Sequence, residues 1–361
     1  MLYWLLFPFA SRYPAFNVFR YITFRTAMSA VTALFLALTL GPAMIRWLRA
    51  AQIRQSIRQE GPKSHLAKAG TPTMGGVLIL LAVATATLLW MDLSNRFVWI
   101  ALGTLLALGA VGFADDYVKV TRRRNLGLSG RGKLIPQFLV ALAVAWAITQ
   151  WAGHGAFSTV VTFPFLKRLL IPLGILYIPF VALVVVGSSN AVNLTDGLDG
   201  LAIGAVGIAA GTYAVLAYVT GNFVTARYLQ IPFIPQSGEL TVFCGALVGA
   251  SLGFLWFNCH PAEIFMGDVG SLPLGAAIAA VAVMTKQEIL LVIVGGLFVM
   301  EALSVIIQVV SFKLTGKRVF RMAPIHHHFE LAGWAESRVI IRFWILAILF
   351  AVLALSTLKL R

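Results

Sequence analysis

The sequence predicts an all-α, polytopic integral membrane protein with about ten transmembrane helices. Its 361 residues are 60% hydrophobic and only 11% charged, with a mean hydropathy of +0.89. Soluble domains carry roughly 25% charged residues, and apolar runs of about 17–25 residues are long enough to cross a bilayer as helices. We therefore expect a single transmembrane helical bundle over residues 1–361, with any chemistry carried by its loops.

Ten apolar runs define the expected spans. They cover residues 22–48, 74–91, 97–113, 134–151, 170–188, 201–219, 240–257, 269–285, 289–312 and 339–358. The fifth run contains Pro172 and Pro179, which we interpret as a kinked span, because neighbouring helices can satisfy the backbone groups that a proline frees. Residues 1–10 are apolar but lack a basic segment and a cleavage site, so we expect an interfacial stretch there instead of a signal peptide.

Basic residues concentrate in alternate loops and predict the orientation. The loops after the first, third and ninth spans hold Arg46, Arg49, Arg54, Arg58, Lys63, Lys68, Lys119, Arg122, Arg123, Arg124, Arg131, Lys133, Lys313, Lys317, Arg318, Arg321, Arg338 and Arg342. By the positive-inside rule these loops face the cytoplasm, which leaves both termini on the outer, periplasmic side. The same parity places the loops after the fifth and seventh spans in the cytoplasm.

The net charge of +15 is explained first by membrane topology, and an anionic partner is the second explanation. No nucleic-acid partner is expected. Cys244 and Cys259 lack the spacing of a metal site, so we expect two buried free thiols.

Six carboxylates lie in three short polar breaks between the apolar runs. The breaks read FADDY, NLTDGLDG and EIFMGD, and the acids are Asp115, Asp116, Asp196, Asp199, Glu263 and Asp268. A charged side chain at the centre of a bilayer costs about 2.5–3.5 kcal/mol on insertion scales, so acids in such a chain usually have a function. Because the topology puts all three breaks on one face, we expect one acidic active site at the cytoplasmic surface of the membrane.

Each break also has a plainer interpretation. Asp115 and Asp116 could be a solvated loop start, but adjacent like charges raise at least one pKa, which suits a general base or a cation site. Asn193, Asp196 and Asp199 recur at three-residue steps, which places them on one face of a helical turn. Helix capping explains one of these three residues but not the set.

The third break combines polar and aromatic groups. Asp268 begins the eighth span, where a helix cap is the alternative, and Asn258 and Phe265 lie close by in sequence. Hard oxygen donors without competing cations suit Mg²⁺, which usually takes one or two carboxylates plus substrate phosphates. Phe265 could stack on a base or act as an interfacial anchor.

Two basic loops offer groups to a phosphate. Lys68 and Thr73 lie in KAGTPTMGG, just before the second span, where a helix N-terminus and backbone N–H groups can bind an anion; lipid headgroups are the alternative ligand. Residues 127–133 fit the pattern GxxxxGK, but Leu134 stands where a P-loop needs Ser or Thr, and no strand precedes it. We reject an ATP site there, although Lys133 can still contact a phosphate as a single charge.

A histidine triplet and one buried acid complete the candidates. His326, His327 and His328 follow a proline and could bind metal, donate protons or hold pyrophosphate. Consecutive side chains cannot all point the same way, so we expect no more than two to serve one site. Glu301 lies within the ninth span and should face the bundle interior or pair with a neighbour.

These motifs together resemble those of the polyprenyl-phosphate N-acetylhexosamine-1-phosphate transferases. They appear in order across nearly the whole chain as GTPTMGG (70–76), FADDY (113–117), NAVNLTDGLDGLA (190–202), GFLWFN (253–258), FMGDVGS (265–271) and APIHHHFE (323–330). Within that family the histidine triplet favours the muramoyl-pentapeptide branch over relatives that use N-acetylglucosamine phosphate.

The resemblance implies transfer of phospho-N-acetylmuramoyl-pentapeptide from a UDP carrier to undecaprenyl phosphate in the bacterial inner membrane, giving lipid I and UMP with Mg²⁺. It also implies that Asp268 binds Mg²⁺ and that Asp115, with Asp116 beside it, deprotonates the lipid phosphate. The residues implied to line the nucleoside pocket are Asn193, Asp196, Asp199, Asn258 and Phe265. Those implied in phosphate handling are Lys68, Thr73, Lys133, His327, His328 and His326, the last of which we count as catalytic. A homodimer is a further expectation.

Some alternatives stay open. The family commonly has a Lys-Gly-Leu stretch in the third loop, where this chain reads Asn-Leu-Gly-Leu at 125–128, so the cation that meets the substrate there is undetermined. Direct attack by the lipid phosphate and a two-step route through an aspartyl intermediate are both compatible with the sequence. A cation-coupled transporter is the main rival, but it predicts acids at the membrane midplane and an internal repeat. Glu263 receives no role and is expected to be a loop residue.

Overall fold

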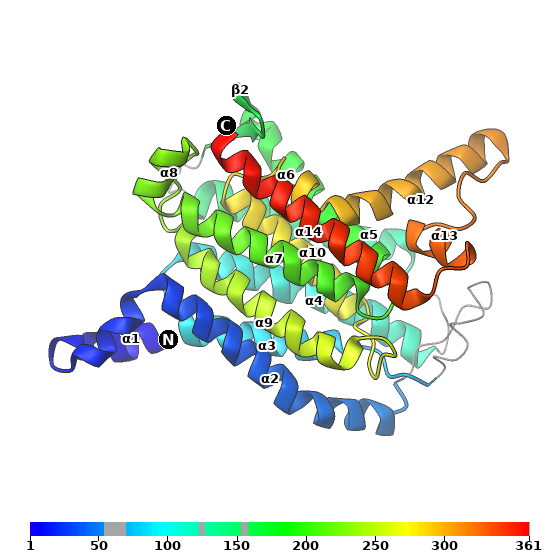
Figure 1. Ribbon diagram of the computed structural model, residues 1–361, viewed down its shortest axis with the longest axis horizontal. Coiled ribbons are helices and arrows are strands. Elements are labelled where there is room, and N and C mark those ends of the chain that lie inside the picture. The colour runs from blue at the N-terminus through cyan, green and yellow to red at the C-terminus, as the bar shows by residue number, and fades with distance from the viewer. Residues whose placement is uncertain (54–69, 123–126, 153–157, 361) are drawn as a thin grey trace.

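The computed structural model describes residues 1–53, 70–122, 127–152 and 158–360, and shows a mostly helical protein (Figure 1). Among these residues, eight helices are long and apolar enough to cross a membrane, and three shorter apolar helical segments accompany them: Leu2–Ser11, α3 and α10. The eight together with α3 and α10 correspond to the ten predicted spans. The ten are α2 (Ile22–Ala50), α3 (Gly76–Trp90), α4 (Arg96–Thr121), α5 (Gly130–Ala147), α6 (Tyr177–Thr195), α7 (Leu201–Thr220), α9 (Leu240–Asn258), α10 (Asp268–Met284), α12 (Gly296–Thr315) and α14 (Glu336–Leu360). Each predicted range overlaps one of them, and the chain is a polytopic membrane protein.

The remaining elements are short. They are α1 (Leu2–Leu6), η1 (Phe7–Ser11), η2 (Pro14–Arg20), η4 (Ile148–Ala152), β1 (Val160–Phe163), β2 (Leu166–Pro172), η5 (Gly174–Leu176), α8 (Phe223–Leu229), η6 (Ser237–Glu239), α11 (Leu291–Val294) and α13 (Ile325–Leu331). The predicted ninth span therefore begins as the separate turn α11, and the long helix α12 starts only after Gly295.

The predicted start of the fifth span is wrong, and so is a strictly all-α fold. Strands β1 and β2 form an antiparallel hairpin in which Val161 lies opposite Ile171, and α6 begins only at Tyr177. Hydropathy cannot distinguish a short apolar strand from the start of a helix. Pro172 ends β2, and Pro179 lies in the first turn of α6, where a missing N–H breaks no helical hydrogen bond.

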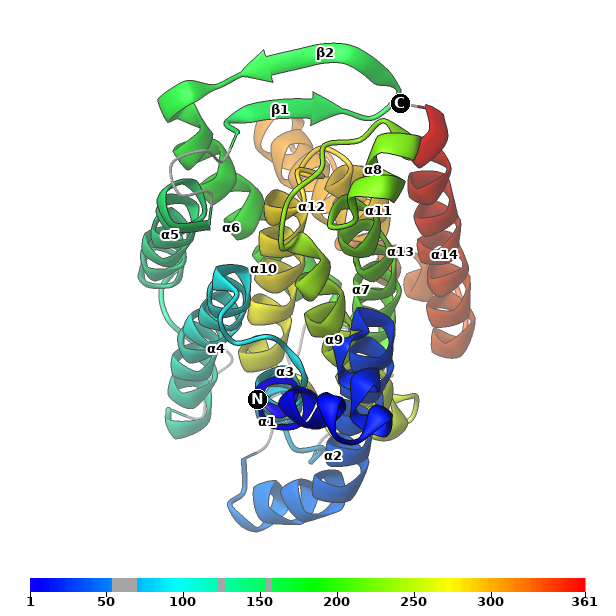
Figure 2. The same cartoon turned by 90° about the vertical axis from the view of Figure 1, so that its left-hand side faces the viewer.

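Helix α10 lies inside the bundle. All of its residues are buried, and it packs against α3, α4, α6 and α7. Figure 2 shows it surrounded by its neighbours, with the hairpin β1–β2 across one end of the bundle. A helix in this position contacts protein on all sides, so its N-terminal residue Asp268 is held by protein groups.

Both chain termini lie at one end of the bundle, the left-hand end in Figure 1. Helix α4 ends, and helix α10 begins, at the opposite end. The acidic motifs of the sequence are carried by that opposite end.

Candidate active site

The junction of α4 and α10 brings Asp115, Asp116 and Asp268 together. Each offers a carboxylate oxygen, these oxygens lie within 4.8 Å of one another, and all three residues are buried. The two helices meet closely at Gly112, where an added Cβ would lie 2.2 Å from the main-chain oxygen of Asp268. Glycine at this position therefore permits the approach that unites acids far apart in the sequence.

Two lysines neutralise this acidic centre in part. The Nζ of Lys119 lies 2.6 Å from Asp115, 3.2 Å from Asp116 and 2.9 Å from Asp268, and the Nζ of Lys133 lies 2.6 Å from Asp268. Sequence reasoning counted Lys119 only as a basic loop residue. Its spacing of three and four residues from the acidic pair on one helix is the signal that could have identified it.

Main-chain N–H groups also bind the acidic pair. Leu128 donates to Oδ1 of Asp115 at 2.8 Å, and Val269 donates to Oδ2 of Asp116 at 3.0 Å. Hydrogen bonds to a carboxylate favour its ionised form. The segment that resembled a P-loop thus contributes a backbone donor and Lys133, which lies in the first turn of α5 and faces an aspartate.

Asn193, at the end of α6, completes the surroundings of Asp268. Its Nδ2 donates to Oδ1 of Asp268 at 2.7 Å and to Oγ of Ser271 at 2.8 Å, while Nζ of Lys133 donates to its Oδ1 at 3.5 Å. Asn193 therefore contacts the acidic centre directly, although the sequence had grouped it with the nucleotide residues.

The motifs around Thr73 and Phe265 are joined by main-chain hydrogen bonds. Phe265 N donates to the oxygen of Pro72 at 2.8 Å, and Gly75 N donates to the oxygen of Phe265 at 2.9 Å. Thr73 is buried near Gly267 and Asp116, while Phe265 is half-buried. This pairing holds both motifs next to Asp268. Lys68 lies outside the described residues.

Asp199 and Asn258 hold loops together. Asp199 Oδ2 accepts from Ala262 N at 3.1 Å and lies 3.1 Å from Nδ1 of His260. Asn258 accepts from Gly200 N at 3.1 Å and donates to the oxygen of Ile264 at 2.8 Å. Both side chains thus tie residues 196–200 to the segment 259–265.

Glu336 was missed by the sequence analysis. Its Oε1 accepts from Asp199 N at 3.1 Å, so the first turn of α14 also holds the loop 196–200. Glu263 is exposed, as expected for a loop residue. Of the two cysteines, Cys244 is buried as expected, but the expectation is wrong for Cys259, which is exposed because it follows the last residue of α9.

Asp196 follows α6 directly and is half-buried beside the centre. Loss of solvent and then the like charges of Asp268, Asp116 and Asp199 raise its pKa to about 8. This carboxyl group therefore changes protonation near neutral pH.

The three histidines point in different directions. Nδ1 of His326 lies 3.1 Å from Oε1 of Glu301, Nδ1 of His327 lies 2.7 Å from Glu330, and Nδ1 of His328 accepts from Arg321 N at 3.1 Å. His326 is fully buried and packs against Gly197, so it reaches the loop 196–200. The expectation that Glu301 faces the interior and pairs with a neighbour is confirmed.

This fold and site define a polytopic membrane protein with a buried acidic centre at one end of its helices. Residues 98–286, about half of the chain, match the family model for glycosyl transferase family 4, and residues 68–80 match signature 1 of phospho-N-acetylmuramoyl-pentapeptide-transferase.

Three similar curated proteins are named phospho-N-acetylmuramoyl-pentapeptide-transferase. The chain is 60% identical over 365 residues to the protein of Desulfatibacillum aliphaticivorans, 59% over 361 to that of Geobacter sp. (strain M21) and 57% over 379 to that of Koribacter versatilis (strain Ellin345). Each match covers 100% of both chains. The chain therefore belongs to the phospho-N-acetylmuramoyl-pentapeptide-transferase family, and the resemblance found in its sequence is confirmed.

Proposed function

We propose that the protein transfers phospho-N-acetylmuramoyl-pentapeptide from UDP-N-acetylmuramoyl-pentapeptide to undecaprenyl phosphate, forming lipid I and UMP. The observation that carries this proposal is the convergence of Asp115, Asp116 and Asp268 on Lys119 and Lys133. Both substrates bring phosphate groups, one from water and one from lipid, so the reaction needs charged groups where a helical bundle meets the membrane surface. One pyrophosphate bond replaces another, and no ATP is required.

The acidic centre suits a Mg²⁺ ion. Its donors are oxygens, they are buried, and three of them lie within 4.8 Å of one another, which matches the preference of Mg²⁺ for carboxylates plus substrate phosphates. We assign Asp268 as the principal ligand, with Asp115 and Asp116 beside it. Bound there, the ion would offset the negative charge of the pyrophosphate.

The protein groups have distinct roles in this proposal. Asp115, which contacts Nζ of Lys119 and accepts a hydrogen bond from Leu128 N, takes the proton of the lipid phosphate. The freed oxygen attacks the phosphorus that bears the sugar, and UMP leaves in line. Lys119 and Lys133 offset the charge on the leaving phosphate, so positioning and electrostatics supply most of the acceleration.

A two-step route through an aspartyl intermediate is the competing mechanism. It predicts that labelled UMP exchanges into the UDP substrate in the absence of lipid. The direct route predicts no such exchange.

We assign the nucleotide to the side of the centre formed by Asp196 and Phe265. Asp199 and Asn258 hold the loops that carry these two residues. His326 packs behind the same loop, at Gly197. Thr73 and the lysines remain the phosphate-handling groups in this assignment, while His327 and His328 lie farther along α13.

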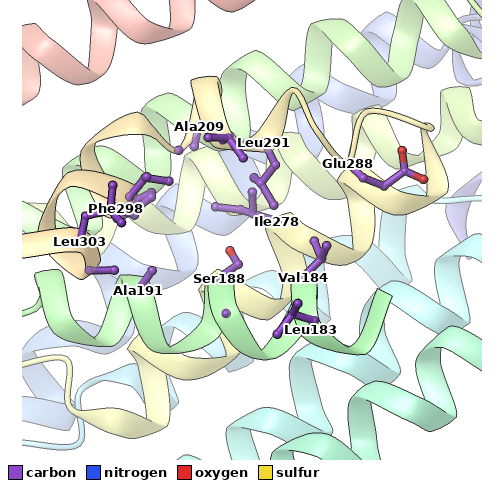
Figure 3. Close-up of a pocket in the computed structure, with 15 residues that line it drawn as sticks. Leu183, Val184, Ser188, Ala191, Ala209, Ile278, Glu288, Leu291, Phe298 and Leu303 are labelled. Carbon is purple, nitrogen blue, oxygen red and sulfur yellow. The ribbon is translucent and has the colours of Figure 1, made fainter. Parts of the chain in front are cut away.

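The lipid tail has a candidate groove. A cavity of about 240 Å³ lies between α6 and the segment α11–α12, and apart from Ser188 and Glu288 its lining residues are apolar or glycine. Figure 3 shows side chains that line it. Helix α6 runs from this cavity to Asn193 at the acidic centre. We therefore place the isoprenoid chain there, with its phosphate at the end of α6.

We also propose that all ten helices span the bacterial inner membrane, with both termini periplasmic and the active site cytoplasmic. Helices α3 and α10 have 15 and 17 residues, so at 1.5 Å per residue they reach roughly 22–26 Å, against a hydrocarbon core of about 30 Å. Since α10 is enclosed by protein, it incurs little cost for being short. The single catalytic domain, residues 1–361, and a homodimer stay predictions.

Release of UMP tests the proposal. The purified protein in detergent should release UMP from UDP-N-acetylmuramoyl-pentapeptide only when undecaprenyl phosphate and Mg²⁺ are both present. Asp268→Asn should lower turnover by roughly 100-fold or more, since one close electrostatic contact to a transition state is worth about 10²–10³. Equal turnover with UDP-N-acetylglucosamine would favour the related branch, and cation transport by proteoliposomes without UMP release would favour the transporter.

A further inference from the structure

Glu301 is an ionisable residue inside an apolar membrane helix and has no role in the reaction described above. It lies in α12 and is 0% exposed. Within the described chain, Oε1 lies 3.1 Å from Nδ1 of His326, which is ion-pair distance, and neither the two carboxylate oxygens nor the two ring nitrogens have a hydrogen-bond partner. Burying a carboxylate without a partner is energetically costly, so we take His326 as the group that offsets the cost of burying Glu301.

The other side of the His326 ring contacts the nucleotide loop. An added Cβ at Gly197 would lie 2.3 Å from Nε2 and 2.8 Å from Cε1, so the imidazole rests on the main chain between Asp196 and Asp199. A carboxylate at one ring nitrogen determines the orientation of the ring and which nitrogen carries the proton. The position of this loop therefore depends on a ring that Glu301 holds from behind.

Helix α12 also lines the apolar cavity. Phe298 and Leu303 belong to its wall (Figure 3), as does Ala302, and Glu301 lies between Phe298 and Ala302 in sequence. One helix thus contributes the cavity wall and the carboxylate that holds His326.

We propose that Glu301 is a positioning residue for the transfer reaction. It holds Nδ1 of His326, keeps the ring against Gly197 and so sets the loop that carries Asp196 and Asp199. It acts on nucleotide binding through the histidine and touches no substrate itself. This inference rests on the proposed function, because that function assigns the loop to the nucleotide.

Three variants on α12 test the role. Glu301→Leu removes the acceptor, Glu301→Gln keeps an oxygen that can accept from Nδ1–H, and Ser304→Ala is the matched control. Ser304 is 2% exposed and donates to the main-chain oxygen of Glu301 at 2.7 Å, so its loss disturbs the same buried helix face without removing the carboxylate.

Glu301→Leu should lower kcat/KM by roughly 10–100-fold, the range seen when an orienting partner is removed behind a functional histidine. Most of the loss should appear as a higher KM for the UDP substrate, with the KM for undecaprenyl phosphate unchanged. Glu301→Gln should retain more activity than the leucine variant, and Ser304→Ala should stay within about twofold of the parent protein. Equal losses in Glu301→Leu and Ser304→Ala would overturn the proposal.

A double-mutant cycle separates positioning from general support of the fold. If Glu301 acts through the histidine, adding Glu301→Leu to His326→Asn should cause little further loss of kcat/KM. Independent, multiplying losses would show that the two residues do not work as a pair.

Histidine NMR gives a readout that does not depend on catalysis. The chain has six histidines, so ¹⁵N-histidine labelling is tractable, and His326→Asn identifies the His326 signals. Glu301→Gln and Glu301→Leu should shift those signals, whereas an unchanged His326 spectrum in both would contradict the pairing. Absence of UMP release by the parent protein would refute the proposed function alone, because the His326 spectra test the contact between Glu301 and His326 without catalysis.

Discussion

At the scale of single residues, Lys119 organises the site. Its ammonium group contacts all three carboxylates. It reaches Asp115 and Asp116 because they lie one turn earlier on α4, and it reaches Asp268 because α10 packs against α4. A lysine and a divalent cation compete for the same carboxylate oxygens. The charge balance at this centre therefore depends on Lys119 together with Lys133.

Replacing Lys119 by methionine should change metal affinity and turnover in opposite directions. The three acids lose a competing cation, so the Mg²⁺ concentration for half-maximal activity should fall by about tenfold or more, since a charge pair at 4 Å is worth about 4 kcal/mol even at an effective dielectric of 20. Turnover at saturating Mg²⁺ should fall, because Lys119 no longer offsets charge on the leaving phosphate. Steady-state UMP release over a Mg²⁺ titration measures both effects.

The exposed Lys313→Met is the control for that titration and should behave as the parent protein. A higher Mg²⁺ requirement in Lys119→Met would contradict the idea that this lysine competes with the metal.

The raised pKa of Asp196 predicts how the stability of the protein depends on pH. This pKa is raised to about 8 in the folded protein, from an ordinary value of 3.8. Between these values the folded state binds more protons than the unfolded state, so the stability that this group contributes declines as pH rises from about 4 to 8. In metal-free buffer the parent protein should lose thermal stability relative to Asp196→Asn between pH 6 and pH 8.

Differential scanning fluorimetry in detergent with EDTA measures this trend, and Glu263→Gln controls for removal of one exposed carboxylate. A difference in Tm between parent and Asp196→Asn that stays constant with pH would contradict the raised pKa.

At the scale of elements, the approach of α4 to α10 creates the acidic centre. Gly112 lies where the two helices touch, and Asp115 and Asp116 follow within one turn. Hydropathy predicted the approximate ranges of both helices, but the distance between α4 and α10 depends on a missing Cβ. Hydropathy failed at the hairpin β1–β2, because its apolar residues fit the pattern of a membrane span but form strands.

Gly112→Ala should therefore separate the helices. The added methyl group would meet the main-chain oxygen of Asp268 at 2.2 Å, which no side-chain rotation relieves. Turnover should fall by about 100-fold, the effect of displacing catalytic groups by roughly 1 Å, and overpacking should cost about 1–3 kcal/mol of stability. UMP release and Tm measure the two effects.

Gly103→Ala on the same helix is the matched control, because an added Cβ there meets nothing within 4 Å. Full activity in Gly112→Ala would show that the distance between α4 and α10 is unimportant for the reaction.

At the scale of the whole molecule, one end of the bundle carries the acidic centre and the other carries both termini. The exposed Cys259 lies at the end with the acidic centre, in the segment that Asp199 holds. Cys244 is buried inside α9. The chain therefore contains one natural accessibility probe for the side on which the site lies.

A membrane-impermeant maleimide should label Cys259 in inverted inner-membrane vesicles and leave it unlabelled in intact spheroplasts. Ser11→Cys combined with Cys259→Ala should give the reverse pattern, since Ser11 is exposed near the N-terminus. Cys259→Ala alone should abolish labelling. Labelling of Cys259 in intact spheroplasts would place the site on the periplasmic side and refute the topology.

The sequence by itself determined the membrane class, the approximate ranges of the helices, the motifs and the family, because hydropathy, charge and motif order are properties of the local chain. Only the tertiary structure decided which of these residues meet. Asp115 and Asp268 are united by the contact at Gly112, Lys119 is aimed at all three acids, and Glu301 is paired with His326. Such distances depend on how closely helices from remote parts of the chain can approach, and that depends on packing.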